Sequence, residues 1–330
     1  MPKWTSPLGS NWKSIRIGSQ EPPPSETIER TTPGIALALG GGAARGWAHI
    51  GILKAFDEAE IPIDMIAGTS IGALVGGCYL AGKLPELEEF ALSLTKRRIF
   101  GLLDFNFSGS GLLAGMRLSN RMREHLEGLK IEDLPKPFVC VAAELRTGHE
   151  IWLHSGSLVT AIRASYALPG VFSPVVCNGR VLVDGALVNP VPVSVCRAYE
   201  QQVVVAVNLS NHIFGRAAVI RHAADLDELP ETPEGETAAP PHPLVVHRGP
   251  HLPDKPIGLL GVMIESFNII QDRISRARLA GDPPDLTLQL KLGNLGLAEF
   301  HRAAEAIEVG YQAGKAHATE IKDMLQLLKD

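Results

Sequence analysis

The chain has 330 residues, of which 45% are hydrophobic and 20% are charged, and a formal net charge of −5. This length supplies enough apolar material for a sizeable core, and the chain lacks the basic balance of a dedicated nucleic-acid binder. The four cysteines show neither C-x-x-C nor metal-ligand spacing, so we expect reduced thiols and a cytoplasmic location. The amino-terminal segment has no continuous apolar run and predicts no secretory signal.

The sequence predicts a lead-in followed by a single domain. Residues 1–33 are polar and rich in proline, which indicates a flexible segment, and residues 34–330 are assigned to the domain. Strand–helix–strand–helix order at its start predicts an α/β fold in three layers (α/β/α), with a mainly parallel central sheet. These first elements are expected at Ile35–Leu39, from about Gly46 to Glu60, at Ile63–Ala67 and at Ala73–Ala81.

The uncharged run Met65–Gly82 has two interpretations. Its 18 residues reach the lower length limit for a transmembrane helix, and its glycine spacing resembles that of packed membrane helices. However, its five glycines would make a poor isolated helix. A buried strand that continues into a buried helix explains the same residues without a membrane, and we favour that interpretation.

Two later segments show no clear period. Phe100–Ala114 mixes glycines with apolar residues and is interpreted either as a lid or membrane-contact patch, or as an ordinary loop. Residues 211–256 are rich in proline and acidic residues, which predicts a surface insertion. The other predicted elements are short apolar strands and one long carboxyl-terminal helix, at Phe138–Ala143, Ile151–His154, Arg180–Val183, Val203–Leu209, Leu286–Leu290 and Ala298–Leu328.

A nucleophile-elbow pattern lies between a predicted strand and a predicted helix, where Gly68-Thr69-Ser70-Ile71-Gly72 fits G-x-S-x-G. The flanking glycines allow a sharp turn, so that Ser70 projects away from the core. Its backbone would also begin a helix, where the partial positive charge favours a developing alkoxide. We therefore predict a nucleophilic serine rather than a structural one.

A glycine cluster, Gly40–Gly42, follows the first predicted strand and precedes a helix. Successive backbone N–H groups in such a loop can point at one oxygen and stabilise an oxyanion. The alternative is the dinucleotide-binding pattern G-x-G-x-x-G, but its third glycine would fall at Arg45. The acidic residue of that pattern could be Asp64, which more simply starts a strand. Proximity to the serine elbow favours the oxyanion interpretation.

The base that would activate Ser70 is less evident. None of the histidines after Ser70 lies in a strand-end turn with a recognisable motif. Asp184 ends a predicted strand and enters the turn Gly185-Ala186, a place from which a carboxylate can reach the elbow of a neighbouring strand. A turn-capping aspartate explains this motif equally well. A free aspartate has a pKa near ~3.9 and is a weak base, so either partial burial raises its basicity or proton transfer is concerted with the attack of the serine.

Taken in order, these blocks resemble the patatin-like phospholipase family, and most of all its bacterial, single-domain esterase/lysophospholipase branch. The similarity is strongest from Ile35 to Leu209, and the departures from the family are the lead-in and the 211–256 insertion. The matching blocks are Gly-Gly-Gly-x-x-Arg-Gly at 40–46, Gly-x-Ser-x-Gly at 68–72, Arg163-Ala164-Ser165, Leu168-Pro169-Gly170-Val171-Phe172 and Asp-Gly-Ala at 184–186.

The resemblance implies a serine esterase that hydrolyses phospholipid or lysophospholipid acyl esters. Ser70 would be the nucleophile and Asp184 the base, with no histidine, metal or other cofactor. Backbone N–H groups of Gly40, Gly41 and Gly42 would form the oxyanion hole. Residues that support these motifs are Arg45, Gly68, Gly72, Gly185 and Ala186.

Two further expectations concern partners and alternatives. A lipid ester substrate is compatible with peripheral contact at the inner membrane surface, and we predict no nucleic-acid partner; the sequence does not indicate the oligomeric state. The alternative function is a non-catalytic lipid- or fatty-acid-binding regulatory protein on the same fold. Retention of both Ser70 and Asp184 favours the enzyme, because a binder needs neither.

Overall fold

The computed structural model describes residues 33–95, 124–209 and 259–328. The predicted lead-in (except Pro33), the segment Phe100–Ala114 and the 211–256 insertion lie outside these ranges. The division into a lead-in and a single domain therefore stays a prediction.

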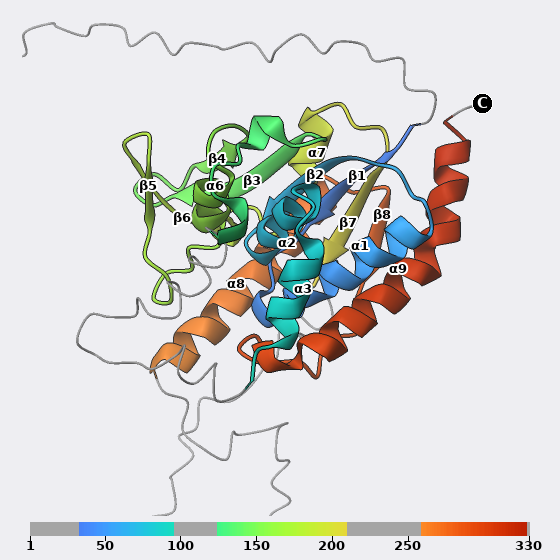
Figure 1. The fold of residues 1–330 in the computed structure, drawn as a ribbon. Coiled ribbons are helices and arrows are strands. Elements are labelled where there is room, and N and C mark those ends of the chain that lie inside the picture. The colour runs from blue at the N-terminus through green and yellow to red at the C-terminus, as the bar shows by residue number, and fades with distance from the viewer. Residues whose placement is uncertain (1–32, 96–123, 210–258, 329–330) are drawn as a thin grey trace, which may run out of the picture. The chain divides into compact units, whose positions relative to one another are not determined.

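The described strands form one mixed sheet at the centre of the fold (Figure 1). Five of them run parallel in the order β3-β2-β1-β7-β8: Phe138–Glu144, Ile63–Thr69, Ile35–Leu39, Val204–Asn208 and Leu286–Gln289. Three further strands pair antiparallel at the β3 edge: β4 (Glu150–Leu153), β5 (Val175–Cys177) and β6 (Arg180–Asp184). The predicted parallel sheet is thus confirmed for its main part, and β5 is a strand that we did not predict.

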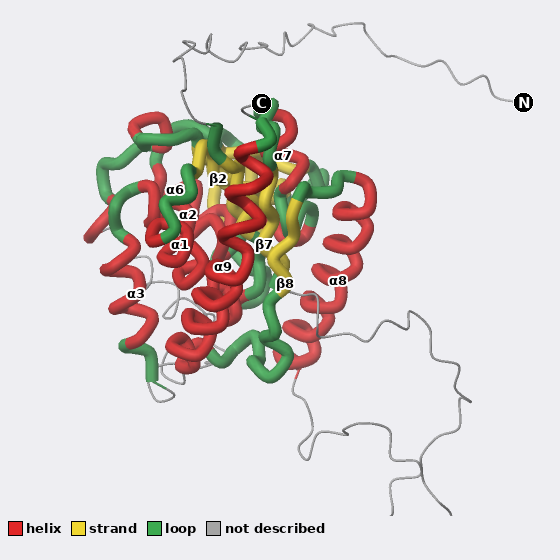
Figure 2. The backbone as a smooth tube through the Cα atoms, turned by 90° about the vertical axis from the view of Figure 1, so that its right-hand side faces the viewer, coloured by secondary structure: helices red, strands yellow, loops and turns green. Residues whose placement is uncertain are grey.

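Helices cover both faces of the sheet and complete the predicted three layers (Figure 2). One face carries α1, α2, α3, α6 and α9, which span Ala48–Glu58, Ile71–Leu80, Leu84–Leu92, Leu158–Ser165 and Ala303–Gln326. The other face carries α7 (Val193–Ala198) and α8 (Leu259–Gly281). Short 3₁₀ turns complete the described part: η1 (Ala43–Trp47), η2 (Ile131–Asp133), η3 (Gly185–Leu187) and η4 (Phe300–Arg302).

Strand β1 shows how the sequence determines these layers. Ile35, Leu37 and Leu39 pack into the larger cluster beneath α1 and α9, whereas Ala36 and Ala38 face the smaller cluster beneath α7. All five side chains are fully buried. A strand covered on both faces needs an uninterrupted apolar run rather than an alternating one, and this is the pattern that the sequence carries.

The run Met65–Gly82 is divided between a strand and a helix, as we favoured from the sequence. Its first residues form the last part of β2, Ser70 forms the turn, and the residues that follow form α2. Most of its side chains are buried. Within the described ranges, no helix is both long and apolar enough to span a bilayer. All four cysteines are free thiols, as predicted.

Candidate active site

The site is built around Ser70, at the sharp turn between β2 and α2. Its backbone has φ 57° and ψ −122°, a conformation that L-residues rarely adopt and that tends to persist only at functional sites. Gly72 makes this turn possible, because a Cβ added there would lie 2.2 Å from the carbonyl oxygen of Leu39. The hydroxyl of Ser70 is therefore held at the carboxyl end of the parallel strands.

Asp184 lies beside it. The Ser70 hydroxyl donates a hydrogen bond to Asp184 Oδ2 at 2.7 Å, and the other carboxylate oxygen accepts one from the backbone N–H of Ala186 at 2.8 Å. Asp184 is the last residue of β6, which runs antiparallel to β3 with Asp184 opposite Ala142. This antiparallel edge brings the carboxylate to the serine, although 114 residues separate them in the chain.

The carboxylate is almost fully buried, with 1% of its surface exposed. Burial raises the pKa of Asp184 to about 7, and the hydrogen bonds from Ser70 and Ala186 oppose this shift only in part. Loss of solvation disfavours the charged form, so burial outweighs the two donors. Of the two routes considered from the sequence, burial favours the first, in which the pKa of Asp184 lies close to neutral pH.

One histidine, His49, hydrogen-bonds to the backbone of the glycine loop. His49 is fully buried in α1, and its Nε2 lies 2.8 Å from the carbonyl oxygen of Gly40. Burial lowers the pKa of His49 to about 4, so the ring is neutral at pH 7 and donates to Gly40. Within the described part of the chain, no imidazole hydrogen-bonds to Ser70 or Asp184.

The glycine loop is close to Ser70, but its donors are distributed differently from our prediction. The N–H of Gly40 donates to Val207 and that of Gly41 donates to Pro190. Among the described residues, the N–H groups of Gly42 and Ala43 have no backbone partner. Those two groups, rather than the N–H groups of Gly40 and Gly41, are the loop donors left for an oxyanion in this conformation.

Comparison with known proteins matches the part of the chain that contains these residues. The family model described as patatin-like phospholipase matches residues 37–197, a range that includes the glycine loop, Ser70 and Asp184. The chain is 33% identical to an uncharacterized NTE family protein of Mycobacterium tuberculosis, over 91% of this chain and 94% of that protein. The chain belongs to the patatin-like phospholipase family.

Other relatives match a smaller part of this family member. It is 33% identical to patatin-like phospholipase domain-containing protein 6 of Homo sapiens, over 54% of this chain and 13% of the human protein. It is also 35% identical to the lysophospholipase NTE1 of Mycosarcoma maydis, over 54% of this chain and 10% of the fungal protein. The second and third relatives are thus far longer proteins that share one region with this chain.

Ala43, which directly follows the glycine loop, is a second strained residue of the site. Its φ is 48°, in the left-handed region that a Cβ disfavours. Ala43 and its neighbour Gly42, whose N–H groups have no backbone partner among the described residues, therefore lie where the loop turns towards α1. Neither the positive φ of Ala43 nor the loss of the Gly41 donor has a signal in the sequence.

The buried hydroxyl of Ser165 supports the elbow, a role that our sequence interpretation did not assign. It accepts a hydrogen bond from the backbone N–H of Ser70 at 2.9 Å and donates one to the carbonyl oxygen of Val141 at 2.6 Å. The neighbouring Thr69 hydroxyl donates to the carbonyl oxygen of Asn189 at 2.8 Å. The position of Ser165 in a family-typical block was the available signal.

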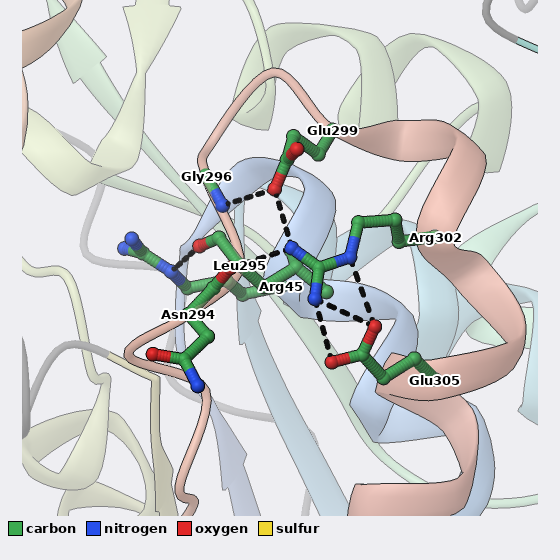
Figure 3. Close-up of polar contacts among 7 residues, drawn as sticks. All are labelled: Arg45, Asn294, Leu295, Gly296, Glu299, Arg302 and Glu305. Atoms are coloured by element: carbon green, nitrogen blue, oxygen red, sulfur yellow. Dashed lines mark hydrogen bonds and ion pairs between the residues drawn. The ribbon is translucent and has the colours of Figure 1, made fainter.

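Arg45, which we assigned to support of the loop, contacts a carboxyl-terminal segment (Figure 3). Its Nε donates to the carbonyl oxygen of Leu295 at 2.7 Å. Arg302 holds the same segment through the carbonyl oxygen of Asn294, and the N–H of Ala44 donates to Leu297. The glycine loop is therefore braced from outside by residues 294–297, which lie beyond the family match.

The position of Asp64 argues against the dinucleotide-binding interpretation of the glycine loop. Its Oδ2 accepts a hydrogen bond from the N–H of Gly34, and its Oδ1 lies 3.4 Å from the ammonium of Lys136. Asp64 is near the amino end of β2, whereas the glycine loop follows the carboxyl end of the parallel strand β1. The Asp64 carboxylate therefore lies at the opposite end of these strands from the loop and cannot share a ligand with it.

Proposed function

We propose that this chain is a serine esterase that hydrolyses lipid acyl esters, of phospholipid or lysophospholipid type, through a Ser70–Asp184 dyad. The observation that carries the proposal is the 2.7 Å hydrogen bond from the strained Ser70 elbow to a buried carboxylate. Membership of the patatin-like phospholipase family supports lipid-ester hydrolysis, as does a relative named lysophospholipase.

The geometry suits a covalent mechanism. Ser70 Oγ attacks the carbonyl carbon of the ester while its proton passes to Asp184, and the oxyanion that forms accepts hydrogen bonds from the glycine loop. The C–O bond to the alcohol then breaks, and the alcohol takes the proton from Asp184. Water attacks the acyl-enzyme in the same way, gives its proton to Asp184, and releases the fatty acid as Ser70 regains its hydrogen.

Peripheral contact with a lipid surface forms part of the proposal. Helix α8 exposes four apolar side chains, each 44% to 48% accessible: Val262, Met263, Ile269 and Ile270. An apolar helix surface beside a lipid-hydrolysing site is suited to the interface of a bilayer. Ile269→Glu combined with Ile270→Glu should lower sedimentation with anionic vesicles, whereas Val176→Glu, at an apolar residue of β5 that is 71% exposed, should not.

A fluorophosphonate probe and an ester panel test the catalytic proposal. We expect the probe to label the wild type, and labelling to disappear in Ser70→Ala. Hydrolysis of phospholipid, lysophospholipid and short soluble esters should fall by about 10³-fold or more in Asp184→Asn. Asp133→Asn, which changes an exposed aspartate outside the site, serves as the matched control and should retain activity.

The alternative, a non-catalytic lipid- or fatty-acid-binding protein, predicts a different result. Such a protein would bind fatty acid with unchanged affinity in Ser70→Ala, and the wild type would release no product from any ester. Turnover that depends on Ser70 would reject it. A cytoplasmic location stays a prediction from cysteine usage.

A further inference from the structure

Helix α8 buries four polar side chains and exposes several apolar ones. Four polar residues spaced along one face are 1% to 3% exposed: Asn268, Gln271, Asp272 and Ser275. Ile269 and Ile270, on the opposite face, are 47% and 45% exposed. A surface helix normally buries its apolar face and exposes its polar one. Burial of a polar group is unfavourable unless the group is hydrogen-bonded. Over these residues, the buried face of α8 is therefore polar rather than apolar.

Gln271 is the member of this face that reaches the nucleophile. Helix α8 packs against η3, the turn that follows Asp184. A Cβ placed on Gly41 would lie 3.0 Å from Gln271 Nε2, 3.3 Å from the Ala186 Cβ and 3.5 Å from the Ser70 Cβ. The side-chain amide of Gln271 thus borders the same small space as the glycine loop and the serine side chain.

The amide has hydrogen-bonding capacity to spare. Within the described ranges, the Gln271 side chain makes no hydrogen bond. Its amide is not among the unpartnered polar atoms that are fully enclosed, so part of the amide surface is accessible. A primary amide carries two N–H donors. Because the amide is not fully enclosed, those donors are free to meet a bound molecule.

The distribution of donors in the loop gives this amide a role. Two of the three glycine N–H groups donate to Val207 and Pro190, so the loop has fewer donors than its sequence suggests. Resting on the proposed function, we propose that Gln271 is a catalytic residue whose Nε2 donates a hydrogen bond to the oxyanion formed at the ester carbonyl. Gly42 and Ala43 supply backbone donors to the same oxygen from the loop, and Gln271 supplies a side-chain donor from α8.

Gln271→Met removes both donors at nearly constant volume, and Gln271→Glu keeps the shape of the side chain while replacing the amide nitrogen by oxygen. Loss of one oxyanion donor lowers kcat by about 10²–10³-fold. On a soluble p-nitrophenyl ester we expect that fall in kcat in both variants, with KM unchanged within about threefold. Labelling by a fluorophosphonate should slow in parallel, because the phosphoryl oxygen occupies the oxyanion position.

Gln312→Met is the matched control, since the side chain of Gln312, in α9, bonds to Glu308 on its own helix and to no other described residue. It should leave kcat and labelling at the wild-type level. Thermal unfolding of each variant identifies loss of folding, and either Gln271 variant that folds decides the question. A raised KM with kcat unchanged would overturn the inference, because it would place the amide on the ground-state substrate. Wild-type kinetics in the variants would overturn it as well.

The two proposals can fail separately. Activity that survives in Ser70→Ala rejects the proposed serine mechanism, whatever Gln271 does. Activity that depends on Ser70 but not on Gln271 rejects only the role of the amide.

Discussion

The hydroxyl of Ser165 accepts a hydrogen bond from the backbone N–H of Ser70 at 2.9 Å, at the carboxyl end of α6. Two residues further on, the carbonyl oxygen of Ala167 accepts one from the backbone N–H of Asp184 at 3.0 Å. The end of one helix therefore contacts the backbone of both members of the proposed dyad. Both hydrogen bonds act through the backbone, so this helix end helps to fix the relative positions of Ser70 and Asp184.

Ser165→Ala tests this arrangement. The variant leaves the N–H of Ser70 without its acceptor in a buried place, where an unpaired donor costs about 1–3 kcal/mol. We expect kcat to fall by about 10- to 100-fold with little change in KM, because a small misplacement of the nucleophile affects mainly the chemical step. Steady-state kinetics on a soluble ester measure both constants.

Ser165→Thr keeps the hydroxyl and should restore most of kcat, even though its extra methyl lowers the thermal stability. Ser155→Ala removes an exposed hydroxyl from the loop that precedes α6 and should have no effect. Equal losses in Ser165→Thr and Ser165→Ala would show that packing, and not the hydrogen bond, explains the result.

The pH dependence of activity follows from the buried carboxylate. The proposed base, Asp184, must be ionised to accept the serine proton, and its pKa is raised to about 7. We expect kcat/KM to rise tenfold per pH unit below that value and to level off above pH 8. A profile already flat from pH 5 would mean that the carboxylate titrates near its ordinary pKa in the free enzyme.

Asp184 should also make the protein less stable at neutral pH. Its pKa is higher in the folded chain than the ~3.9 of an unfolded aspartate, so the folded state binds the proton more tightly. Stability therefore falls as pH rises from about 4 to about 7. Asp184→Asn removes the buried charge and should raise the free energy of unfolding by roughly 2–4 kcal/mol at pH 8.

Urea denaturation at pH 4 and pH 8 measures this difference, and the gain should nearly vanish at pH 4. Asp133→Asn should show no such pH-dependent gain. If Asp184→Asn were less stable than the wild type at pH 8, the hydrogen bonds of the carboxylate would outweigh its burial.

The central part of the fold could be predicted because parallel strands carry a local signal. The apolar runs at β1 and β2 are each followed by a glycine motif, and β1 and β2 pair in parallel, with Leu39 opposite Gly68. Parallel pairing brings the two strand ends to one edge of the sheet. The proximity of the glycine loop to Ser70 was therefore implicit in the order of the motifs.

The remainder depends on pairing that no local pattern encodes. The antiparallel direction of β6, which delivers Asp184, depends on its register with β3, and the three residues of β5 are too few for a periodic signal. The acceptors of the Gly40 and Gly41 N–H groups lie far along the chain. The pattern of α8 misleads as well, because apolar side chains normally indicate the buried face of a helix.

Gly72 provides the last test, since it controls how closely α2 approaches the loop. A Cβ at this position would lie 2.2 Å from the carbonyl oxygen of Leu39 and 2.9 Å from that of Gly40. Backbone atoms cannot yield as a flexible side chain does. We expect Gly72→Ala to lower the free energy of unfolding by about 2 kcal/mol or more, within the range of overpacked cores, and to abolish fluorophosphonate labelling. Gly281→Ala, where an added Cβ meets nothing within 4 Å, should change stability by less than about 1 kcal/mol. A labelled, wild-type-like Gly72→Ala protein would mean that the elbow and the loop are less closely packed than the distances indicate.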